Sequence, residues 1–371
     1  MRDHMKVLHV AETIKGGVAT IARQLMLSQI SSGLESTCLV PKTQAVELIS
    51  VPLKNIETYN STGRNIPSLL KFIVALSITL HTRRPDIVHL HSTFAGLCGR
   101  LILFFMLPFY RPKIIYCPHG WAFIMDGGNA KKRAFALIER LLLKITDTVI
   151  CVSKFEQEAA LSQGFSKEKI IIVNNCVEPP QPVQAINHFD RDVVNLLYVG
   201  RFDHAKGFDT LVDAMALLEG HPFRLTAVGD TVQGGPPPKK LNNINYVGWL
   251  HPSDLAGYFS NADVLIMPSR WESFGLVAAE AHSYGLPVVA SRCCSLPEVV
   301  AEGVTGFLFE PGSSRELVAL LKRIPRSTWS KLGRNSYERY EAKFKSEIMC
   351  TAVLNIYNNS PTSKKLETNE A

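Results

Sequence analysis

The chain has 371 residues, more than an ordinary single domain, so the length predicts two domains. Hydrophobic residues make up 46% of the sequence and charged residues 20%, a globular composition with enough apolar material for two cores. The formal net charge is +7, and all of the surplus lies in residues 1–190, which carry 21 basic and 14 acidic residues. This surplus favours a solvated basic surface or contact with an anionic membrane, and no nucleic-acid motif accompanies it.

Three classes of protein are excluded by simple patterns. The longest apolar run, Leu101–Tyr110, is interrupted by Pro108 and is much shorter than the roughly 18 residues that a membrane-spanning helix needs. The eight cysteines form no C-x-x-C pair and mostly lie in apolar runs, which indicates buried thiols and not a zinc site or disulfide framework. Residues 5–10 form a strand pattern where a signal peptide would lie, so we expect a cytoplasmic protein.

The first half alternates strand-like and helix-like segments. Helical patterns include Val18–Leu27 and Arg133–Leu143. Several strands are continuous Val/Ile/Leu runs, as expected in a parallel sheet that is covered on both faces. We therefore predict a doubly wound, Rossmann-like α/β domain over residues 1–177. Its expected strands are Lys6–Ala11, Ser36–Val40, Asp86–His91, Lys113–Cys117, Asp147–Val152 and Lys169–Val173.

A proline-rich break, predicted as a linker over residues 178–192, separates this domain from a second α/β alternation over residues 193–340. A helix-like segment covers about Ser327–Tyr357, and we expect its part 341–358 to pack back toward the N-terminal domain. Residues 359–371 are polar and predicted to be disordered. The expected strands of the second domain are Asn195–Gly200, Arg224–Gly229, Ile244–Val247, Asp263–Pro268, Leu286–Ser291 and Gly306–Phe309.

The most informative segment of the second domain runs from Pro268 to Ala281. The sequence predicts a loop up to Gly275 and a helix over Leu276–Ser283, whose first N–H groups are suited to a phosphate. Two glutamates, Glu272 and Glu280, lie about 10 Å apart if the helix rises by about 1.5 Å per residue, so they can contact different parts of one ligand. The residues of this segment that are predicted to bind a ligand are Ser273, Phe274, Gly275, Leu276 and Glu280.

Two cations follow the first strand of the same domain. Arg201 comes directly after Gly200, and Lys206 precedes Gly207, so glycines allow the backbone to approach a ligand closely. Arginine can bind a diphosphate through two parallel hydrogen bonds, and lysine supplies a point charge. Gly229 ends the next strand, and all of these positions lie where a doubly wound sheet presents its ligand edge.

These motifs resemble the retaining glycosyltransferases of family 4, which have the GT-B fold of two Rossmann-like domains facing a central cleft. The family's E-x7-E motif matches Glu272 and Glu280, and its Gly-Arg…Lys-Gly motif matches residues 200–207. The resemblance covers about residues 195–315 and implies transfer of a hexose from a UDP- or GDP-sugar. It implies that Arg201 and Lys206 stabilise the leaving diphosphate, that Glu280 binds the ribose, and that Glu272 contacts the transferred sugar.

The first half resembles the same family less densely. Gly16 and Gly17 form a loop between the first strand and a helix that can accommodate a phosphate, although it is not a dinucleotide fingerprint. His119 closes a strand within Cys117–Trp121 and resembles the family's His-Gly segment near the reacting sugar. His89 and His91 share one strand face, and we interpret them as packing or cleft-lining residues, not as a metal pair.

No metal is expected. Other glycosyltransferases hold a divalent ion with an Asp-x-Asp motif, but Asp190-Arg-Asp192 of this chain lies before a strand and not after one. The catalytic set is then His119, Arg201, Lys206 and Glu272. Residues 118–123 resemble transferases of capsule, exopolysaccharide and O-antigen synthesis, which implies a saccharide acceptor linked to lipid. Lys131–Arg133 beside apolar segments such as 101–109 and 123–125 favours peripheral docking on the cytoplasmic face of the inner membrane. The alternatives are a nucleotide-sugar epimerase of the same fold and a non-catalytic sugar-nucleotide-binding protein.

Overall fold

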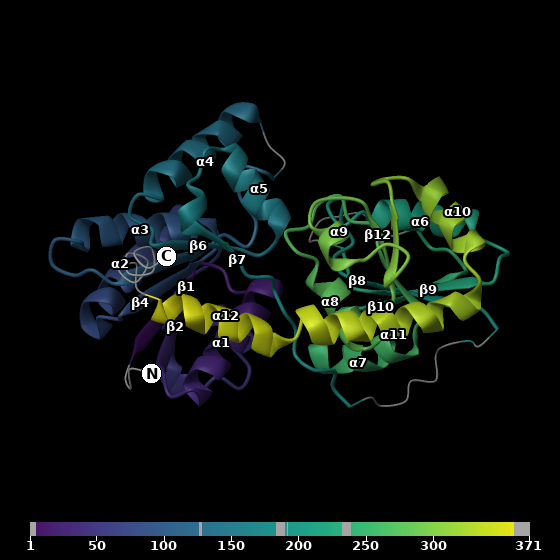
Figure 1. The fold of residues 1–371 in the computed structure, drawn as a ribbon, viewed down its shortest axis with the longest axis horizontal. Helices are drawn as coiled ribbons and strands as arrows, with labels where there is room; N and C mark the ends of the chain where they lie inside the picture. The colour runs from purple at the N-terminus through teal and green to yellow at the C-terminus, as the bar shows by residue number, and fades with distance from the viewer. Residues whose placement is uncertain (1–4, 126–127, 183–189, 191, 232–238, 360–371) are drawn as a thin grey trace, which may run out of the picture. The chain divides into compact units, whose positions relative to one another are not determined.

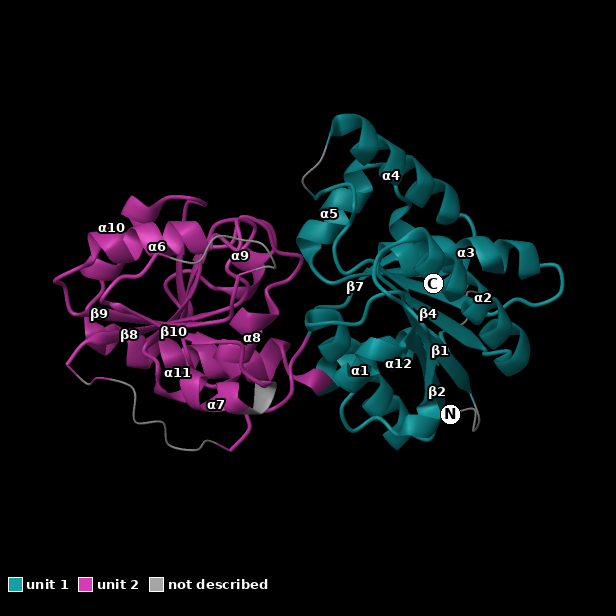
Figure 2. Ribbon diagram, turned by 180° about the vertical axis from the view of Figure 1, so that it is seen from behind, with its two compact units in different colours: residues 1–175, 347–371 teal, residues 176–346 magenta. Residues whose placement is uncertain are grey.

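The computed structural model describes residues 5–125, 128–182, 190, 192–231 and 239–359. The chain forms two compact units, shown in Figure 2: unit 1 contains residues 1–175 and 347–371, and unit 2 contains residues 176–346. Each unit has one open sheet in which every strand pairing is parallel, with helices on both faces. The predicted α/β class with two Rossmann-like domains is therefore confirmed.

Unit 1 contains seven strands in the order β3-β2-β1-β4-β5-β6-β7 (Figure 1). The strands of its centre are buried along nearly their whole length, because helices cover both faces. The order reverses between β1 and β4, and ligands of such sheets bind at this kind of switch point. The strands are β1 (Lys6–Ala11), β2 (Glu35–Pro41), β3 (Ile56–Tyr59), β4 (Ile87–His91), β5 (Lys113–Cys117), β6 (Thr148–Cys151) and β7 (Ile170–Ile172).

The helices of unit 1 lie in two layers, as Figure 1 shows. On one face lie α1 (Gly17–Ser31) and α12 (Ser346–Asn358). On the other face lie α2 (Ile66–Arg83), α3 (Thr93–Met106), α4 (Asn129–Leu142) and α5 (Lys154–Ser162). This division follows from right-handed crossovers, because the chain runs one way across the sheet after β1 and the opposite way after β3. Short 3-10 turns occur at Lys42–Glu47, Leu53–Asn55 and Lys167–Lys169.

Unit 2 contains six strands in the order β10-β9-β8-β11-β12-β13, with the switch point between β8 and β11. Helices α6 (Phe208–Leu217) and α10 (Ser314–Arg323) pack together on one face, and α8 (Leu276–Ser283) packs with α11 (Arg326–Lys343) on the other (Figure 1). The remaining helices are α7 (Pro252–Asn261) and α9 (Leu296–Val299). The strands are β8 (Val194–Val199), β9 (Phe223–Val228), β10 (Ile244–Gly248), β11 (Val264–Met267), β12 (Val288–Ser291) and β13 (Gly306–Phe309).

The C-terminal helical segment differs from the sequence prediction. It is not one helix, because α11 ends at Lys343 and α12 begins at Ser346, five residues later than the predicted residue 341. The interruption is made by Val177: its N–H donates to Phe344 O at 2.8 Å, and its carbonyl accepts from Ser346 N at 3.0 Å. This short bridge takes the place of helical hydrogen bonds, and the boundary between the units falls beside it.

Helix α12 belongs to unit 1 and contacts the interior of its sheet. The Tyr357 hydroxyl is hydrogen-bonded to His89 Nδ1 at 2.6 Å, and Lys113 Nζ donates to Ile356 O at 2.5 Å. The units therefore divide after Asn175 and after Ser346, whereas the sequence placed these divisions at 177 and 340. Residues 183–189 and 191 of the predicted linker, and 360–371 of the predicted tail, lie outside the described residues.

Candidate functional site

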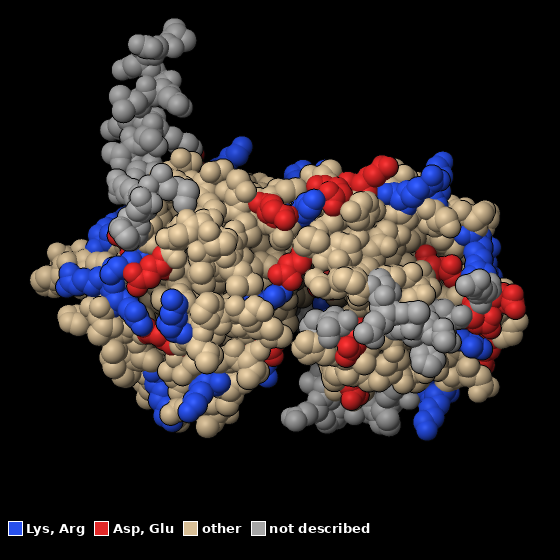
Figure 3. Space-filling model, turned by 90° about the horizontal axis from the view of Figure 1, so that it is seen from below, with Lys and Arg blue, Asp and Glu red and all other residues tan. Residues whose placement is uncertain are grey.

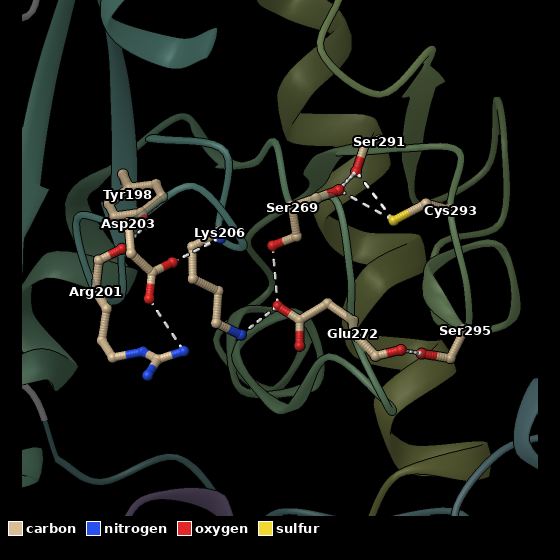
Figure 4. Close-up of polar contacts among 9 residues, drawn as sticks. All are labelled: Tyr198, Arg201, Asp203, Lys206, Ser269, Glu272, Ser291, Cys293 and Ser295. Atoms are coloured by element: carbon tan, nitrogen blue, oxygen red, sulfur yellow. Dashed lines mark hydrogen bonds and ion pairs between the residues drawn. The ribbon is translucent and has the colours of Figure 1, made fainter. Parts of the chain in front are cut away.

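The candidate donor site lies at the switch point of unit 2, where two neighbouring strands end. Gly200 and Arg201 follow β8, and the loop that starts at Pro268 follows the adjacent strand β11. Figure 4 shows that these two loops bring Lys206 and Glu272 together. The sequence motifs, 66 residues apart in the chain, thus form one site because their strands are neighbours.

The centre of this site is an ion pair between two predicted catalytic residues. Lys206 Nζ lies 2.6 Å from Glu272 Oε1, and the Ser269 hydroxyl donates to the same oxygen at 2.9 Å. The Glu272 side chain is only 8% exposed, so its partners hold a nearly buried carboxylate in place. The Ser295 hydroxyl also donates to the Glu272 backbone carbonyl at 3.2 Å, which fixes the backbone of the loop.

Arg201, by contrast, is half exposed and pairs with an aspartate that sequence reasoning missed. Its Nη2 lies 3.1 Å from Asp203 Oδ2, while Asp203 Oδ1 accepts from the Lys206 backbone N–H at 2.8 Å. The Tyr198 hydroxyl donates to the Arg201 carbonyl at 2.6 Å. Asp203 therefore organises the loop that carries both cations. Its position between Arg201 and Lys206 is the feature of the sequence that could have indicated this role.

Two glycines allow the strand ends to approach each other. Gly207 has φ 64°, and a Cβ there would lie 1.9 Å from the Pro268 carbonyl oxygen. Gly229 has φ 136°, and a Cβ there would lie 1.8 Å from the Gly200 carbonyl oxygen. Because these contacts are with backbone atoms, a side chain could enter only if the loops moved apart.

The N-terminus of α8 provides an anion-binding end beside the ion pair. Gly275 is the N-cap and has no side-chain capping hydrogen bond. The N–H groups of Phe274, Gly275 and Leu276 have no hydrogen-bond partner among the described residues. Phe274 is buried and packs edge-on against Phe344, so it anchors the turn, and Ser273 lies in the same turn. Unpaired N–H groups with the helix dipole behind them attract a phosphate.

Glu280 lies on α8, one turn beyond this end of the helix. Burial raises the pKa of its carboxyl to about 7, and no described residue forms a hydrogen bond or ion pair with the carboxylate. A carboxyl that lacks a protein partner is available to a ligand hydroxyl. Glu272, in the loop before the helix, already has Lys206 and Ser269, so the two glutamates have different environments.

Unit 1 has a pocket of about 450 Å³ at the carboxyl ends of β1, β4 and β5. The pocket is next to the exposed glycines Gly16 and Gly17, and Gly16 is the N-cap of α1. His119 lines it from the end of β5, with a left-handed φ of 51° that is uncommon for a residue with a side chain. Four cations also line the pocket: Lys15, Arg64, Lys131 and Lys132.

Behind His119 lies a buried cluster of histidines, one of which sequence reasoning missed. His9 on β1 joins His89 and His91 on β4, and the three bring ring nitrogens within 4.8 Å of one another. Such spacing is compatible with a metal ion, but His9 Nδ1 and His91 Nε2 are hydrogen-bonded to each other at 2.9 Å. Adjacent parallel strands place His9 beside His89 in register, a pairing that the sequence alone does not show.

Comparison with known proteins shows the family of the chain. Residues 15–180 match the family Glycosyltransferase Family 4, and residues 183–341 match Glycosyl transferases group 1. An uncharacterized 41.2 kDa protein in the cps region of Klebsiella pneumoniae is 36% identical over 363 residues, which cover 96% of this chain and 100% of that protein. The chain is a family 4 glycosyltransferase.

Further relatives of this glycosyltransferase extend over most of the chain. The capsular polysaccharide biosynthesis glycosyltransferase CapM of Staphylococcus aureus is 24% identical, over 85% of this chain and 90% of CapM. Sucrose-phosphate synthase of Thermosynechococcus elongatus has the same fold with a TM-score of 0.77 at 23% identity, covering 95% of this chain and 98% of that one. Anabaena HepE, solved with UDP and glucose, has a TM-score of 0.76 at 18% identity, over 96% of this chain and 100% of HepE. The predicted GT-B class agrees with these neighbours.

The helices α2, α3 and α4 of the glycosyltransferase expose several large apolar side chains. On α2 they recur every fourth residue, and α3 and α4 continue the apolar surface. The only acidic residue in these three helices is Glu139, which is buried and paired with Arg100 at 2.6 Å. We call this surface the apolar–basic face; its exposed apolar residues are Ile66, Leu70, Val74, Ile78, Leu101, Phe104, Phe105, Leu137, Ile138 and Leu141.

One part of the sequence prediction for this surface differs in the structure. Phe109 and Met125 are exposed, but Phe123 is 6% exposed and packs in the core of unit 1 against Trp121. Figure 3 shows one side of the molecule, on which basic and acidic side chains both lie at the surface. Among the described helices, none is both long and apolar enough to cross a bilayer.

Proposed function

We propose that this glycosyltransferase moves a hexose, with retention of anomeric configuration, from a nucleoside-diphosphate sugar to a lipid-linked saccharide during synthesis of a cell-surface polysaccharide. The observation that carries the proposal is the Lys206–Glu272 pair beside the unpaired N–H groups of α8. Together, the ion pair and the helix end supply positive charge, unpaired N–H groups and a fixed carboxylate at one edge of the sheet. The cps-region protein of Klebsiella and CapM support the polysaccharide pathway, and HepE, solved with UDP-glucose, supports a sugar nucleotide as donor.

The leaving diphosphate is stabilised by charge and by backbone donors. Lys206 is already held in the site by Glu272, whereas Arg201 exchanges its contact with Asp203 for a phosphate oxygen when the donor binds. The N–H groups at Phe274–Leu276 add hydrogen bonds to the same anion. As the bond to the sugar breaks, negative charge grows on the diphosphate, and these fixed groups stabilise it without a divalent cation.

The remaining residues bind the other parts of the donor. Glu280, which has an available carboxylate, accepts hydrogen bonds from the ribose hydroxyls. Glu272 accepts from hydroxyls of the transferred hexose while it keeps Lys206 in place. His119, at the pocket of unit 1, contacts the reacting sugar, and Gly16 and Gly17 leave the neighbouring backbone open to the donor.

The acceptor reaches the enzyme at a membrane surface. The apolar–basic face can bury side chains such as Phe105 among lipid tails while Lys131, Lys132 and Arg133 of α4 contact anionic headgroups, each adding about 1 kcal/mol near the surface. Lys131 and Lys132 on α4 link this face to the pocket, because they also line it. A lipid-linked saccharide can then present its sugar to His119 while its lipid stays in the bilayer.

Liposome co-sedimentation tests the membrane part of the proposal. Binding should require anionic lipid, fall as salt concentration rises, and weaken when Lys131, Lys132 and Arg133 are changed to Glu or when Phe105 is changed to Ser. The matched control changes Lys239, Lys240 and Arg315, exposed cations of unit 2, to Glu, and it should bind as the wild type does. Absence of binding to anionic vesicles at low salt would remove the membrane from the proposal.

A radiolabelled donor screen tests the reaction. We expect one nucleoside-diphosphate hexose to yield free nucleoside diphosphate together with label in extracted membrane lipid. Conversion of the donor into an epimeric nucleotide sugar would favour the epimerase instead. Donor binding without turnover, in the presence of membrane lipid, would identify a sugar-nucleotide-binding protein.

A further inference from the structure

A continuous row of hydrogen bonds crosses the interior of unit 1 and ends at the pocket. It starts at Gln29 on α1, whose Oε1 lies 2.9 Å from His9 Nε2. His9 Nδ1 lies 2.9 Å from His91 Nε2, and His91 Nδ1 lies 2.9 Å from His119 Nε2. The rings of successive histidines are stacked, with centroids 5.2 Å apart in both pairs. We call these four residues the histidine chain.

The members of the histidine chain are uncharged at neutral pH. Gln29, His9 and His91 are each 1% exposed. Burial lowers the pKa of His9 and of His119 to about 4, and it lowers the pKa of His91 well below the usual value. A neutral imidazole has one N–H donor and one nitrogen lone pair, so each ring donates on one side and accepts on the other. The tautomer of one ring consequently dictates the tautomer of the next.

Gln29 sets the direction of the histidine chain. Its Oε1 accepts from His9 Nε2 at 2.9 Å and from the Ser36 hydroxyl at 2.7 Å. Its Nε2 donates to the Tyr357 hydroxyl. His9 Nδ1 therefore carries a lone pair and accepts the proton of His91 Nε2. His91 Nδ1 in turn accepts from His119 Nε2, which leaves the lone pair of His119 on Nδ1.

The free end of the histidine chain is available to a ligand. His119 Nδ1 has no hydrogen-bond partner among the described residues and, unlike His89 Nε2, is not one of their fully buried unpaired atoms. The charged groups lining the pocket around it are Lys15, Arg64, Lys131 and Lys132, and its neighbours on the sheet are His91 and Cys117. All four charged groups are donors, so His119 contributes an acceptor to a pocket rich in donors.

We propose that Gln29, His9 and His91 are positioning residues that hold His119 as its neutral Nε2–H tautomer, so that Nδ1 accepts a hydrogen bond from a sugar hydroxyl. The inference rests on the proposed function for the identity of the ligand, but the tautomer is a property of the protein alone. An acceptor nitrogen selects a ligand group that can donate, such as a hydroxyl. It disfavours a phosphate or carboxylate oxygen at the same position, because two lone pairs would face each other.

Nitrogen NMR of protein labelled with ¹⁵N-histidine tests the tautomer directly, with the His119 signals assigned by their loss in His119→Ala. We expect a protonated Nε2 and an unprotonated Nδ1 at His119, with no titration between pH 6 and 8. A protonated Nδ1, or a titration near the ordinary histidine pKa, would overturn the inference. So would a shift of the His9 and His91 signals on addition of stoichiometric zinc alone, because a metal ion would replace the proton shared by those rings.

A matched pair of variants tests the positioning role. His91→Phe interrupts the histidine chain, whereas His89→Phe changes a neighbouring buried histidine on the same strand face that lies outside it. In His91→Phe, His119 should become a mixture of tautomers, and kcat for transfer should fall about tenfold relative to His89→Phe, with little change in donor KM. Thermal denaturation shows whether both variants fold equally well. A uniform His119 tautomer in His91→Phe, or equal kcat in the two variants, would contradict the role even if transfer itself is confirmed.

Discussion

Binding of the donor should be linked to deprotonation of Glu280. Burial raises the pKa of this carboxyl to about 7 in the free protein, and the ribose hydroxyls favour the ionised form as hydrogen-bond acceptor. The proton must therefore leave when the nucleotide sugar binds, so affinity rises with pH. With a pKa of about 7, the free carboxyl is about 90% protonated at pH 6 and about 10% at pH 8, which predicts about tenfold tighter binding at pH 8.

Isothermal titration calorimetry with a nucleoside-diphosphate sugar, whose diphosphate does not titrate in this range, measures the effect. Titrations at pH 7 in buffers with different heats of ionisation should show release of about half a proton per donor bound. Glu280→Gln should bind more weakly at pH 8 and lose the pH dependence, which separates the effect of this carboxyl from that of any other titrating group. Equal affinity of the wild type at pH 6 and pH 8, or uptake of protons, would contradict the deprotonation of Glu280 on donor binding.

Four further predictions concern catalysis and stability. Arg201→Ala and Lys206→Ala should each lower turnover at least 100-fold, because each removes a contact to the leaving diphosphate worth about 3 kcal/mol, and near-normal initial rates in both would contradict this assignment. Excess EDTA should leave initial rates unchanged, whereas activity that is lost and then restored by manganese or magnesium would show that a metal takes part. Glu272→Gln should reduce transfer but largely spare affinity for free nucleoside diphosphate, unlike Glu280→Gln, so equal affinity losses in both would oppose the division of roles. Glu139→Ala should destabilise unit 1 by about 3–5 kcal/mol in urea denaturation, because it leaves the fully buried Arg100 without its partner, and an unchanged midpoint would show that the pair contributes little.

The fold was largely predictable because buried parallel strands are continuous apolar runs. Strands β1, β5 and β13 have the predicted bounds, and the other predicted strands differ by one or two residues at one or both ends. β3 was missed, because Ile56–Tyr59 is a short edge strand with a mixed polar sequence and follows a 3-10 turn. The break between α11 and α12 was missed for a different reason. It depends on hydrogen bonds from Val177, almost 170 residues earlier in the chain.

Apart from Gly16 and Gly17, which lie in unit 1, the residues predicted to bind the donor lie in unit 2, because their motifs follow neighbouring strands of one sheet. What the sequence could not show is how these residues pair with one another. The contact of Lys206 with Glu272, and of Arg201 with Asp203, arises from loops that meet only in three dimensions. The apolar–basic face was anticipated only in part, because an exposed apolar row on a helix such as α2 has the same periodicity as a buried one.

The most direct test of the central claim is to follow one labelled donor through transfer in the presence of lipid extract, with wild-type enzyme and Glu272→Gln side by side. We expect equal molar amounts of nucleoside diphosphate and lipid-bound hexose from the wild type, with the anomeric configuration of the donor retained. Both products should decrease together in Glu272→Gln. Lipid-bound hexose of inverted configuration, or equal rates for the two proteins, would contradict the claim that the Lys206–Glu272 site performs retaining transfer to a lipid-linked acceptor.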